Sequence, residues 1–217
     1  MTSVAFLLLA FGMCAAVVNW VAVFREVKAA EYVAKPATLA LFIAAAVAMS
    51  PTDDTVRLWF VIALAFCLLG DVLLMVPHDW FVFGLAAFFV GHLAYIVGLQ
   101  LAGRSGLWFV IGMVVVAVGI GAVGIRIVRA AKVSAPELAV PVTAYMAVIS
   151  VMLASAFGTR NGFAALGALL FFASDAIIAW NKFVRPVPRA QVAIMMTYHF
   201  GQLGLVLSLV WGGWIAS

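Results

Sequence analysis

Residues 57–76 read RLWFVIALAFCLLGDVLLMV and decide the fold class of this chain. After Arg57 come 13 residues without a charge, and then a single aspartate, Asp71, in a stretch that remains apolar. About 20 apolar residues in a helix span the ~30 Å hydrocarbon core of a bilayer. The run does not alternate between apolar and polar residues, as a strand of a membrane barrel does. It therefore predicts a transmembrane helix with an ionisable group inside the membrane.

Similar runs recur along the whole chain. Hydrophobic residues make up 68% of the 217 positions and charged residues only 9%, whereas a soluble domain has about 25% charged residues. We therefore expect an all-α integral membrane protein of the cell membrane, a multi-pass bundle of eight helices that forms a single polytopic domain over residues 1–217. The predicted helices cover residues 2–24, 33–50, 57–76, 80–101, 107–128, 137–157, 162–181 and 190–213.

Several other classes of protein are excluded. Cys14 and Cys67 both fall inside apolar runs, and two such cysteines are too few for a disulfide framework. The formal charge of +4 comes from short basic clusters between apolar runs, so no nucleic-acid partner is expected. Residues 2–24 lack the basic start of a cleaved signal peptide, and we expect them to remain as the first helix.

The basic residues also indicate an orientation. If the eight helices alternate in direction, nine of the twelve Lys and Arg residues lie on one side of the membrane. Such a bias marks the cytoplasmic side and predicts that both termini are non-cytoplasmic. The nine residues are Arg25, Lys28, Lys35, Arg126, Arg129, Lys132, Lys182, Arg185 and Arg189, and the other three are Arg57, Arg104 and Arg160.

A short internal similarity relates the third and seventh predicted helices. Residues 69–74 read LGDVLL and residues 173–178 read ASDAII, and His92 and His199 follow in the next helices. Two parallel four-helix repeats, residues 1–105 and 106–217, would explain this lag. Such repeats would place Asp71 and Asp175 at a similar depth in the cytoplasmic half of the membrane.

Asp71 and Asp175 are the main candidates for chemistry. An aspartate at the centre of a spanning helix costs about 2.5–3.5 kcal/mol on insertion, and such residues normally face the bundle interior and serve a function. Neither has a basic residue within one turn of its own helix, although Lys182 lies two turns after Asp175. Two carboxyl groups in one dry cavity favour different protonation states, as an acid–base pair requires. The alternative is that each one only hydrogen-bonds a neighbouring helix or is hydrated near the interface.

Other polar residues are candidates for substrate binding. His92 and Tyr95 share one helix face, as do Tyr198 and Gln202, because three and four residues separate them. His92 and His199 could each equally be structural. The aspartates and histidines show no spacing typical of a metal site, so we expect no metal and no cofactor. Further candidates are Lys35, Tyr145 and Asn181.

Lys35 precedes Pro36 at the start of the second predicted helix. There Pro36 fits the first turn, where its missing N–H does no harm. The ammonium group of Lys35 could bind a phosphate headgroup as a point charge, or it could simply extend to the interface.

These motifs together resemble the YhhN-like membrane family, which includes the lysoplasmalogenases. The resemblance runs in order along nearly the whole chain. It rests on Lys35-Pro36, on LGDVLLM at 69–75, on Phe83-Gly84, Phe88-Phe89, His92 and Tyr95, on Tyr145, on FASD at 172–175, on NKF at 181–183 and on residues 198–202. It implies an eight-helix hydrolase that cleaves the vinyl-ether bond of a lysophospholipid substrate, a lysoplasmalogen. It also implies that Asp71 and Asp175 are the catalytic pair.

The chemistry of this reaction agrees with the residues. Hydrolysis of an enol ether begins with protonation of the β-carbon, and the resulting oxocarbenium ion resembles the transition state of glycosidases, which also use two carboxyl groups. One aspartate would be protonated, and the other would be ionised to stabilise the cation and orient water. The products would be a fatty aldehyde and glycerophosphocholine or glycerophosphoethanolamine. The sequence does not distinguish the two roles, nor does it specify the headgroup, the chain length or the oligomeric state.

Two other functions remain open at this point. A proton-coupled small-molecule transporter could use the same pair of aspartates as a relay. A lipid-binding scaffold without catalysis would need neither carboxyl group to react, and membrane lipids would then be its partners.

Overall fold

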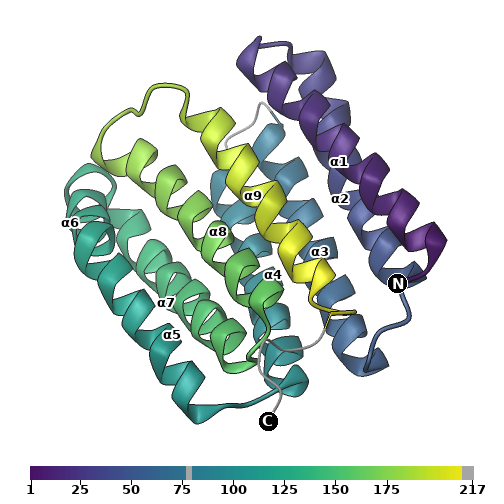
Figure 1. Cartoon of the computed structure of the whole chain (residues 1–217). Helices are drawn as coiled ribbons and strands as arrows, with labels where there is room; N and C mark the ends of the chain where they lie inside the picture. Colours follow the sequence, from purple (N-terminus) through teal and green to yellow (C-terminus); the bar gives the residue numbers. More distant parts are fainter. Residues whose placement is uncertain (77–79, 212–217) are drawn as a thin grey trace.

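The computed structural model describes residues 1–76 and 80–211, over which helices are the only regular secondary structure. They are packed into one antiparallel bundle (Figure 1). The helices are α1 Ser3–Phe24, α2 Lys28–Ala48, α3 Asp54–Met75, α4 Phe81–Ala102, α5 Gly106–Gly119, η1 Ile120–Gly124, α6 Ile125–Ser134, α7 Pro136–Gly158, α8 Gly162–Ala179, η2 Trp180–Val184 and α9 Ala190–Leu207.

The predicted membrane-spanning segments correspond to these helices. Within the described residues, seven helical segments are long and apolar enough to cross a membrane. The eighth predicted segment, 190–213, appears as α9, and residues 212 and 213 lie outside the described residues. The chain is thus a multi-span helical membrane protein.

Several helix boundaries differ from the predictions, notably in the second and fifth helices. The second helix begins at Lys28 rather than at residue 33, since Lys28 and Glu31 form an ion pair (2.8 Å) in its first turn. Pro36 consequently lies inside α2 and not in its first turn, where it leaves one backbone carbonyl without its usual N–H donor.

The fifth predicted helix, 107–128, is also too short. The structure has a continuous helical segment over Gly106–Ser134, with the π-helical turn η1 between α5 and α6. Arg126 and Arg129, expected in a loop, belong to this helix. Lysine and arginine are good helix formers, so a charge ends the apolar run without ending the helix.

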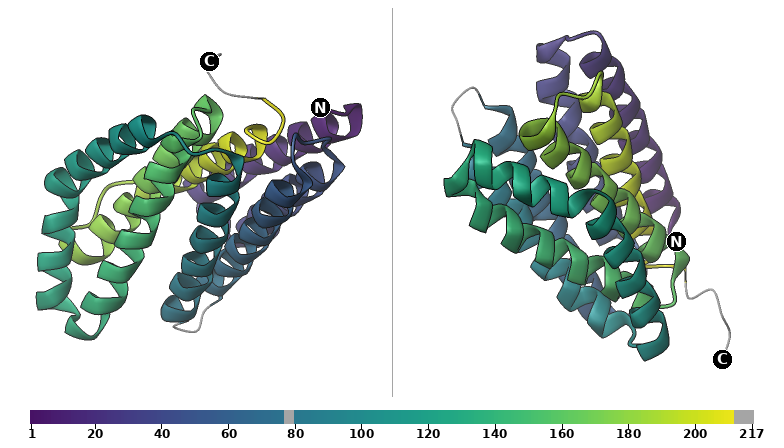
Figure 2. Two further views of the ribbon diagram at one scale, coloured as in Figure 1. Left: turned by 90° about the horizontal axis from the view of Figure 1, so that it is seen from below. Right: turned by 90° about the vertical axis from the view of Figure 1, so that its left-hand side faces the viewer.

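The helices pack as neighbours in sequence and across the bundle. Close pairs are α1 with α2, α3 with α4, and α8 with α9, while α4 also packs on α7 and α9 on α1. Two views show the helical segments from α5 to α7 on one side and α1 to α3 on the other (Figure 2). One buried hydrophobic cluster joins residues from α1 through α9.

Small residues bring α8 and α9 especially close together. A Cβ atom at Gly167 would lie 2.7 Å from the backbone nitrogen of Leu205, and one at Gly201 would lie 2.9 Å from the backbone nitrogen of Phe171. Only glycine allows two helix backbones to approach this closely. The contact fixes α9, which carries Tyr198, against α8, which carries Asp175.

Candidate active site

Asp71 and Asp175 occupy equivalent places in their helices. Each lies one helical turn before the last residue of its α-helix, Met75 for α3 and Ala179 for α8. Both side chains line one polar cavity of about 340 Å³. The two aspartates therefore line the same cavity.

The carboxyl group of Asp71 is held by two donors. The ammonium group of Lys35, on α2, lies 3.0 Å from Oδ1, and the Tyr198 hydroxyl, on α9, donates to Oδ2 at 2.8 Å. The side chains of Lys35 and Asp71 are only 7% and 2% exposed. A buried lysine at this distance, together with a second donor, satisfies an ionised carboxylate. Asp71 has no basic residue near it in its own helix, and its cation comes from another helix.

Lys35 therefore differs from both of its expected roles. Its ammonium group neither extends to the interface nor stands free for a phosphate, because Asp71 binds it inside the bundle. Lys35 still lines the polar cavity. Its pairing with Asp71 could not be read from a spacing within one helix.

Asp175 has different neighbours. The Tyr145 hydroxyl, on α7, donates to Asp175 Oδ2 at 2.6 Å, and Nε2 of His92, on α4, lies 3.2 Å from the same oxygen. Tyr145 and His92 also contact each other at 3.1 Å. Among the described residues, no hydrogen-bond partner is found for Oδ1 of Asp175, and the side chain is 14% exposed.

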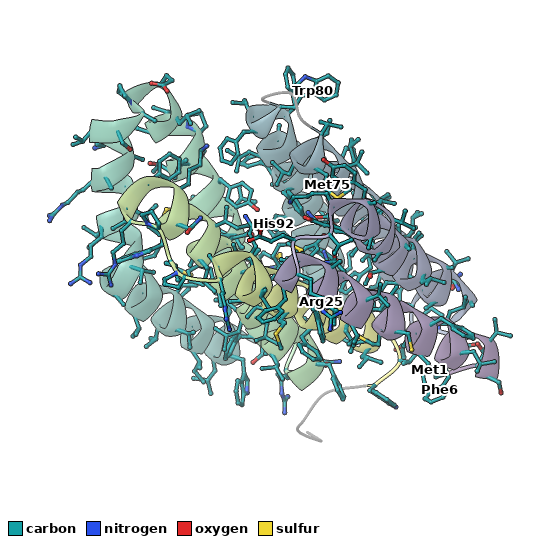
Figure 3. All side chains as sticks on the ribbon, turned by 90° about the horizontal axis from the view of Figure 1, so that it is seen from above. Met1, Phe6, Arg25, Met75, Trp80 and His92 are labelled. Atoms are coloured by element: carbon teal, nitrogen blue, oxygen red, sulfur yellow. The ribbon has the colours of Figure 1, made fainter. Side chains whose placement is uncertain are left out.

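His92 joins this network through Nε2. The Tyr145 hydroxyl donates its one proton to Asp175. An N–H at Nε2 of His92 can donate to the same oxygen of Asp175. Nδ1 is buried without a partner among the described residues. Figure 3 shows His92 among the helices, whereas Trp80 and Phe6 lie at the periphery.

Aromatic rings separate the two carboxyl networks. The ring of Phe171 packs edge-on against His92 on one side, with centroids 4.7 Å apart, and against Tyr198 on the other, at 5.2 Å. Phe88 packs against Phe171 and Tyr198 in the same manner. Each network is thereby shielded from the other by apolar rings, although both carboxyl groups reach the cavity.

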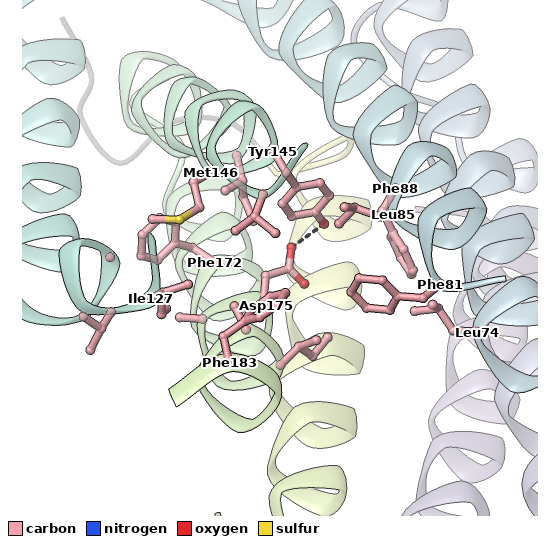
Figure 4. Close-up of a pocket in the computed structure, with 17 residues that line it drawn as sticks. Leu74, Phe81, Leu85, Phe88, Ile127, Tyr145, Met146, Phe172, Asp175 and Phe183 are labelled. Atoms are coloured by element: carbon pink, nitrogen blue, oxygen red, sulfur yellow. Dashed lines mark hydrogen bonds between the residues drawn. The ribbon is translucent and has the colours of Figure 1, made fainter. Parts of the chain in front are cut away.

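A second, apolar cavity of about 70 Å³ adjoins the polar one at Asp175 (Figure 4). The two cavities share Asp175 and the apolar side chains of Leu74, Phe81, Phe88 and Ile178. The apolar cavity extends between α7 and α8 toward η1 and α6, where Met146, Phe172 and Ile127 line it. Asp175 thus lies where a charged cavity meets a hydrocarbon-like one.

The remaining predicted residues lie at different distances from the cavities. Asn181 and Tyr198 line the polar cavity and Tyr145 lines the apolar one. Tyr95 and Gln202 line neither: they are fully buried and joined by a hydrogen bond of 2.5 Å from the tyrosine hydroxyl to Oε1. These two residues therefore do not reach either cavity, and any effect on a substrate would be indirect, through Tyr198 and Asp71.

His199, the second histidine of the internal similarity, is placed apart from the carboxyl groups. Its Nδ1 accepts a hydrogen bond of 3.0 Å from the indole N–H of Trp20, on α1. Within the described residues, no group of three or more His, Cys, Asp and Glu side chains is arranged to hold a metal ion. The two histidines are therefore not equivalent in their contacts, despite their equivalent places in the sequence.

The polar cavity also contains residues that were not predicted to bind substrate. They are Lys28, Glu31 and Tyr32 from the start of α2, and Lys182 from η2. Lys28, Glu31 and Lys35 recur at helical spacing on one face, and this signal was present in the sequence. It was missed because the helix was expected to begin only at residue 33.

Comparison with known proteins supports a family assignment. The YhhN family model matches residues 30–209. Human lysoplasmalogenase TMEM86B is 35% identical over 147 residues, which are 67% of this chain and 61% of the human protein. A Mycobacterium bovis lysoplasmalogenase is 31% identical over 181 residues, 81% of this chain and 69% of that protein.

The matched part is shorter than the relatives themselves. The alignment covers 61% of the human protein and 58% of pig lysoplasmalogenase TMEM86B, which is 33% identical over 141 residues, or 64% of this chain. No solved structure matches the chain. The match of the family model over most of the sequence confirms the resemblance seen in the motifs: the chain belongs to the YhhN family.

Proposed function

We propose that this chain is a lysoplasmalogenase, which hydrolyses the vinyl-ether bond of a lysoplasmalogen to a fatty aldehyde and glycerophosphocholine or glycerophosphoethanolamine. Relatives that bear this name support the proposal. The observation that carries it is the position of Asp175 between a polar and an apolar cavity. The transporter interpretation has no support among these relatives.

The two cavities match the two parts of a single-chain ether lipid. The apolar cavity, lined by Tyr145, Phe172 and Ile127 among others, takes the hydrocarbon chain. The polar cavity, with its lysines and carboxylates, takes the glycerol and its headgroup. The vinyl-ether bond joins these parts of the lipid, so it lies beside Asp175, which lines both cavities.

The different neighbours of the two aspartates suggest different roles. Asp71 is the ionised group, because Lys35 and the Tyr198 hydroxyl occupy its two oxygens. Asp175 is the acid, because its neighbours Tyr145 and His92 hold Oδ2 without supplying a fixed cation. This arrangement leaves Oδ1 to carry the proton toward the substrate.

The reaction then balances within the pair. Asp175 gives its proton to the β-carbon, and the carboxylate of Asp71 stabilises the oxocarbenium ion. Water then adds to the α-carbon and passes one proton to Asp71. This addition converts the oxocarbenium ion into a hemiacetal. As the hemiacetal collapses, its hydroxyl proton returns to Asp175, and Asp71 gives its proton to the departing glycerol oxygen. Aldehyde and alcohol leave, and both aspartates regain their initial states.

His92 and Tyr145 are positioning residues in this scheme. Their hydrogen bonds hold Asp175 Oδ2 and thereby orient Oδ1. They also stabilise the carboxylate that forms when the proton leaves. A positioned acid–base group typically contributes about 10²–10⁴-fold to a rate.

The orientation in the membrane follows from the positive residues. Lys28 and Lys182, which line the polar cavity, belong to the nine basic residues expected on the cytoplasmic side. We place this end of the bundle in the cytoplasm, so the chain takes its substrate from the inner leaflet. The start of α1 and the end of α9, which lie at the opposite end (Figure 1), would then be outside the cytoplasm.

The test is aldehyde release by the purified full-length chain in detergent. A 1-alkenyl-glycerophosphoethanolamine should yield aldehyde, while the matching 1-alkyl ether and 1-acyl ester should yield none. Proteoliposomes that release no aldehyde but carry out proton-driven flux of a small molecule would contradict the proposal.

A further inference from the structure

The lysines and carboxyl groups of the polar cavity do not all form pairs. Three lysines and three carboxyl groups line it. Lys28 pairs with Glu31 at 2.8 Å, and Lys35 pairs with Asp71 at 3.0 Å. The third carboxyl group, Asp175, is held by the Tyr145 hydroxyl and the His92 ring. Lys182 thus remains as the third cation.

Lys182 forms no ion pair with a carboxylate of the described residues. Its ammonium group instead lies over the ring of Phe81, 4.0 Å from the centroid. Phe81 itself lines both cavities. A cation–π contact orients an ammonium group but does not neutralise its charge, so Lys182 retains the capacity to bind an anion.

The backbone beside Lys182 is firmly fixed. The π-helical turn η2 spans Trp180–Val184, and the side-chain carbonyl of Asn181 accepts a hydrogen bond of 2.8 Å from the backbone N–H of Val187. The side-chain oxygen of Asn181 therefore shapes the chain after α8, while the residue still lines the polar cavity. Lys182 projects from this fixed turn into the polar cavity.

The distance between Lys182 and Asp175 suits one class of ligand. Seven residues along a helix correspond to about 10 Å. In a glycerophospholipid, seven covalent bonds separate the phosphorus atom from the β-carbon of the vinyl ether. Bonds of ~1.5 Å at near-tetrahedral angles give these seven bonds an extended length of roughly 9 Å. An anion held at Lys182 would therefore leave the vinyl ether within reach of Asp175.

We propose that Lys182 is the phosphate-binding residue of this site and selects substrates with a monoanionic phosphodiester headgroup. The proposal rests on the proposed function for its orientation, because it places the phosphate two helical turns from the proton donor. It transfers the phosphate contact expected for Lys35 to the cavity lysine that has no carboxylate partner among the described residues. A neutral alkenyl glycerol would lack this contact and would bind weakly.

Binding of ligands that cannot react tests the proposal separately from catalysis. The full-length chain in detergent is titrated with 1-O-hexadecyl-glycerophosphoethanolamine and with 1-O-hexadecylglycerol, which differ only in the phosphate headgroup. The wild-type protein should prefer the phospholipid by about 10- to 100-fold, the usual value of a hydrogen bond to a charged group. Lys182→Gln should abolish this preference, and Lys182→Arg should retain most of it.

Lys132→Gln is the matched control, since Lys132 is an exposed lysine on α6 that lines neither cavity. It should leave both affinities unchanged. Equal binding of the two ligands by the wild-type protein, or a preference that survives Lys182→Gln, would overturn the proposal. Glycerophosphoethanolamine without a chain should compete only at much higher concentration; equal competition would identify the site as one for free phosphodiesters.

If the phospholipid preference depends on Lys182 but no alkenyl substrate is hydrolysed, the phosphate site stands and the proposed function fails. If substrate is hydrolysed but Lys182→Gln lowers turnover of alkenyl phospholipid and alkenyl glycerol equally, the proposed function stands and the phosphate site fails.

Discussion

Asp71 and Asp175 are the same residue type in one bundle, yet they have different surroundings. Each aspartate lies one turn before the end of an apolar helix, and both line the same cavity. Asp71 is bound by an ammonium group and is almost inaccessible, whereas Asp175 is bound by a hydroxyl and an imidazole ring and is partly open. The difference lies in the facing helices, α2 and α9 for Asp71 and α4 and α7 for Asp175. The protonation states that we propose for the two aspartates thus rest on tertiary contacts and not on the local sequence.

Removing the proton of Asp175 should have the largest effect. Asp175→Asn keeps an oxygen that can accept the hydrogen bond from Tyr145, so the fold should be retained. The proposed acid is lost, however, and the rate of aldehyde release should fall about 10²–10⁴-fold. A variant that elutes as the wild-type protein from size exclusion but keeps its activity would rule out Asp175 as the acid.

Removing the cation of Asp71 should mainly affect stability. Lys35→Met leaves a buried carboxylate without its partner, which typically costs about 3–5 kcal/mol. Thermal unfolding in detergent should show a large decrease in Tm. The double variant Lys35→Met/Asp71→Asn should recover much of it, since no charge is then left unpaired. A double variant less stable than Lys35→Met would argue against the ion pair.

The two tyrosines compare the two networks directly. Tyr198→Phe removes a hydrogen bond to a charged carboxylate, and a loss of about 1.5–3 kcal/mol in unfolding free energy is expected. Tyr145→Phe removes one from the carboxyl group proposed to be neutral, and about 0.5–1.5 kcal/mol is expected. Denaturation of both variants under identical conditions gives the comparison. A larger loss for Tyr145→Phe would reverse the assignment of charge.

The smallest effect should be found at the far wall of the apolar cavity. A Cβ atom at Gly124 would lie 2.8 Å from Cε of Met146, so the end of this flexible side chain would be pushed toward the space for the lipid chain. Gly124→Ala should weaken binding of long-chain substrates by about 1 kcal/mol, or roughly five-fold. Short-chain substrates should bind as before.

Gly121→Ala, in the same π-helical turn, provides the control because nothing lies within 4 Å of its Cβ position. KM values for substrates of different chain length separate the two variants. An equal change in KM for Gly121→Ala and Gly124→Ala would mean that the lipid chain does not occupy this cavity.

Much of the architecture could be predicted because lipid imposes simple constraints on sequence. An apolar run of about 20 residues has few alternatives to a spanning helix, so the segments around Asp71 and Asp175 were predicted nearly to their boundaries. Helix ends marked by charge were less predictable. Lys28 and Arg129 lie inside helices, since a lysine or arginine ends the hydrophobic signal and not the hydrogen-bonded backbone.

The candidate site was predictable in its components but not in its pairings. The aspartates, Lys35, Tyr145 and Tyr198 are unusual residues for apolar helices, and composition alone identified them. Their contacts join α2 to α3 and α7 to α8, and no spacing within one helix encodes such contacts. The two repeats, residues 1–105 and 106–217, stay a prediction. The observation that bears on it is the similar position of the two aspartates in their helices.

The most direct test of this account is infrared spectroscopy of the protein at neutral pH, which distinguishes a protonated carboxyl group from a carboxylate. The wild-type protein should show the C=O band of a buried carboxylic acid. This band should disappear in Asp175→Asn and persist in Asp71→Asn. A band that is lost in Asp71→Asn and kept in Asp175→Asn would contradict the assignment of Asp175 as the proton donor and Asp71 as the ionised partner of Lys35.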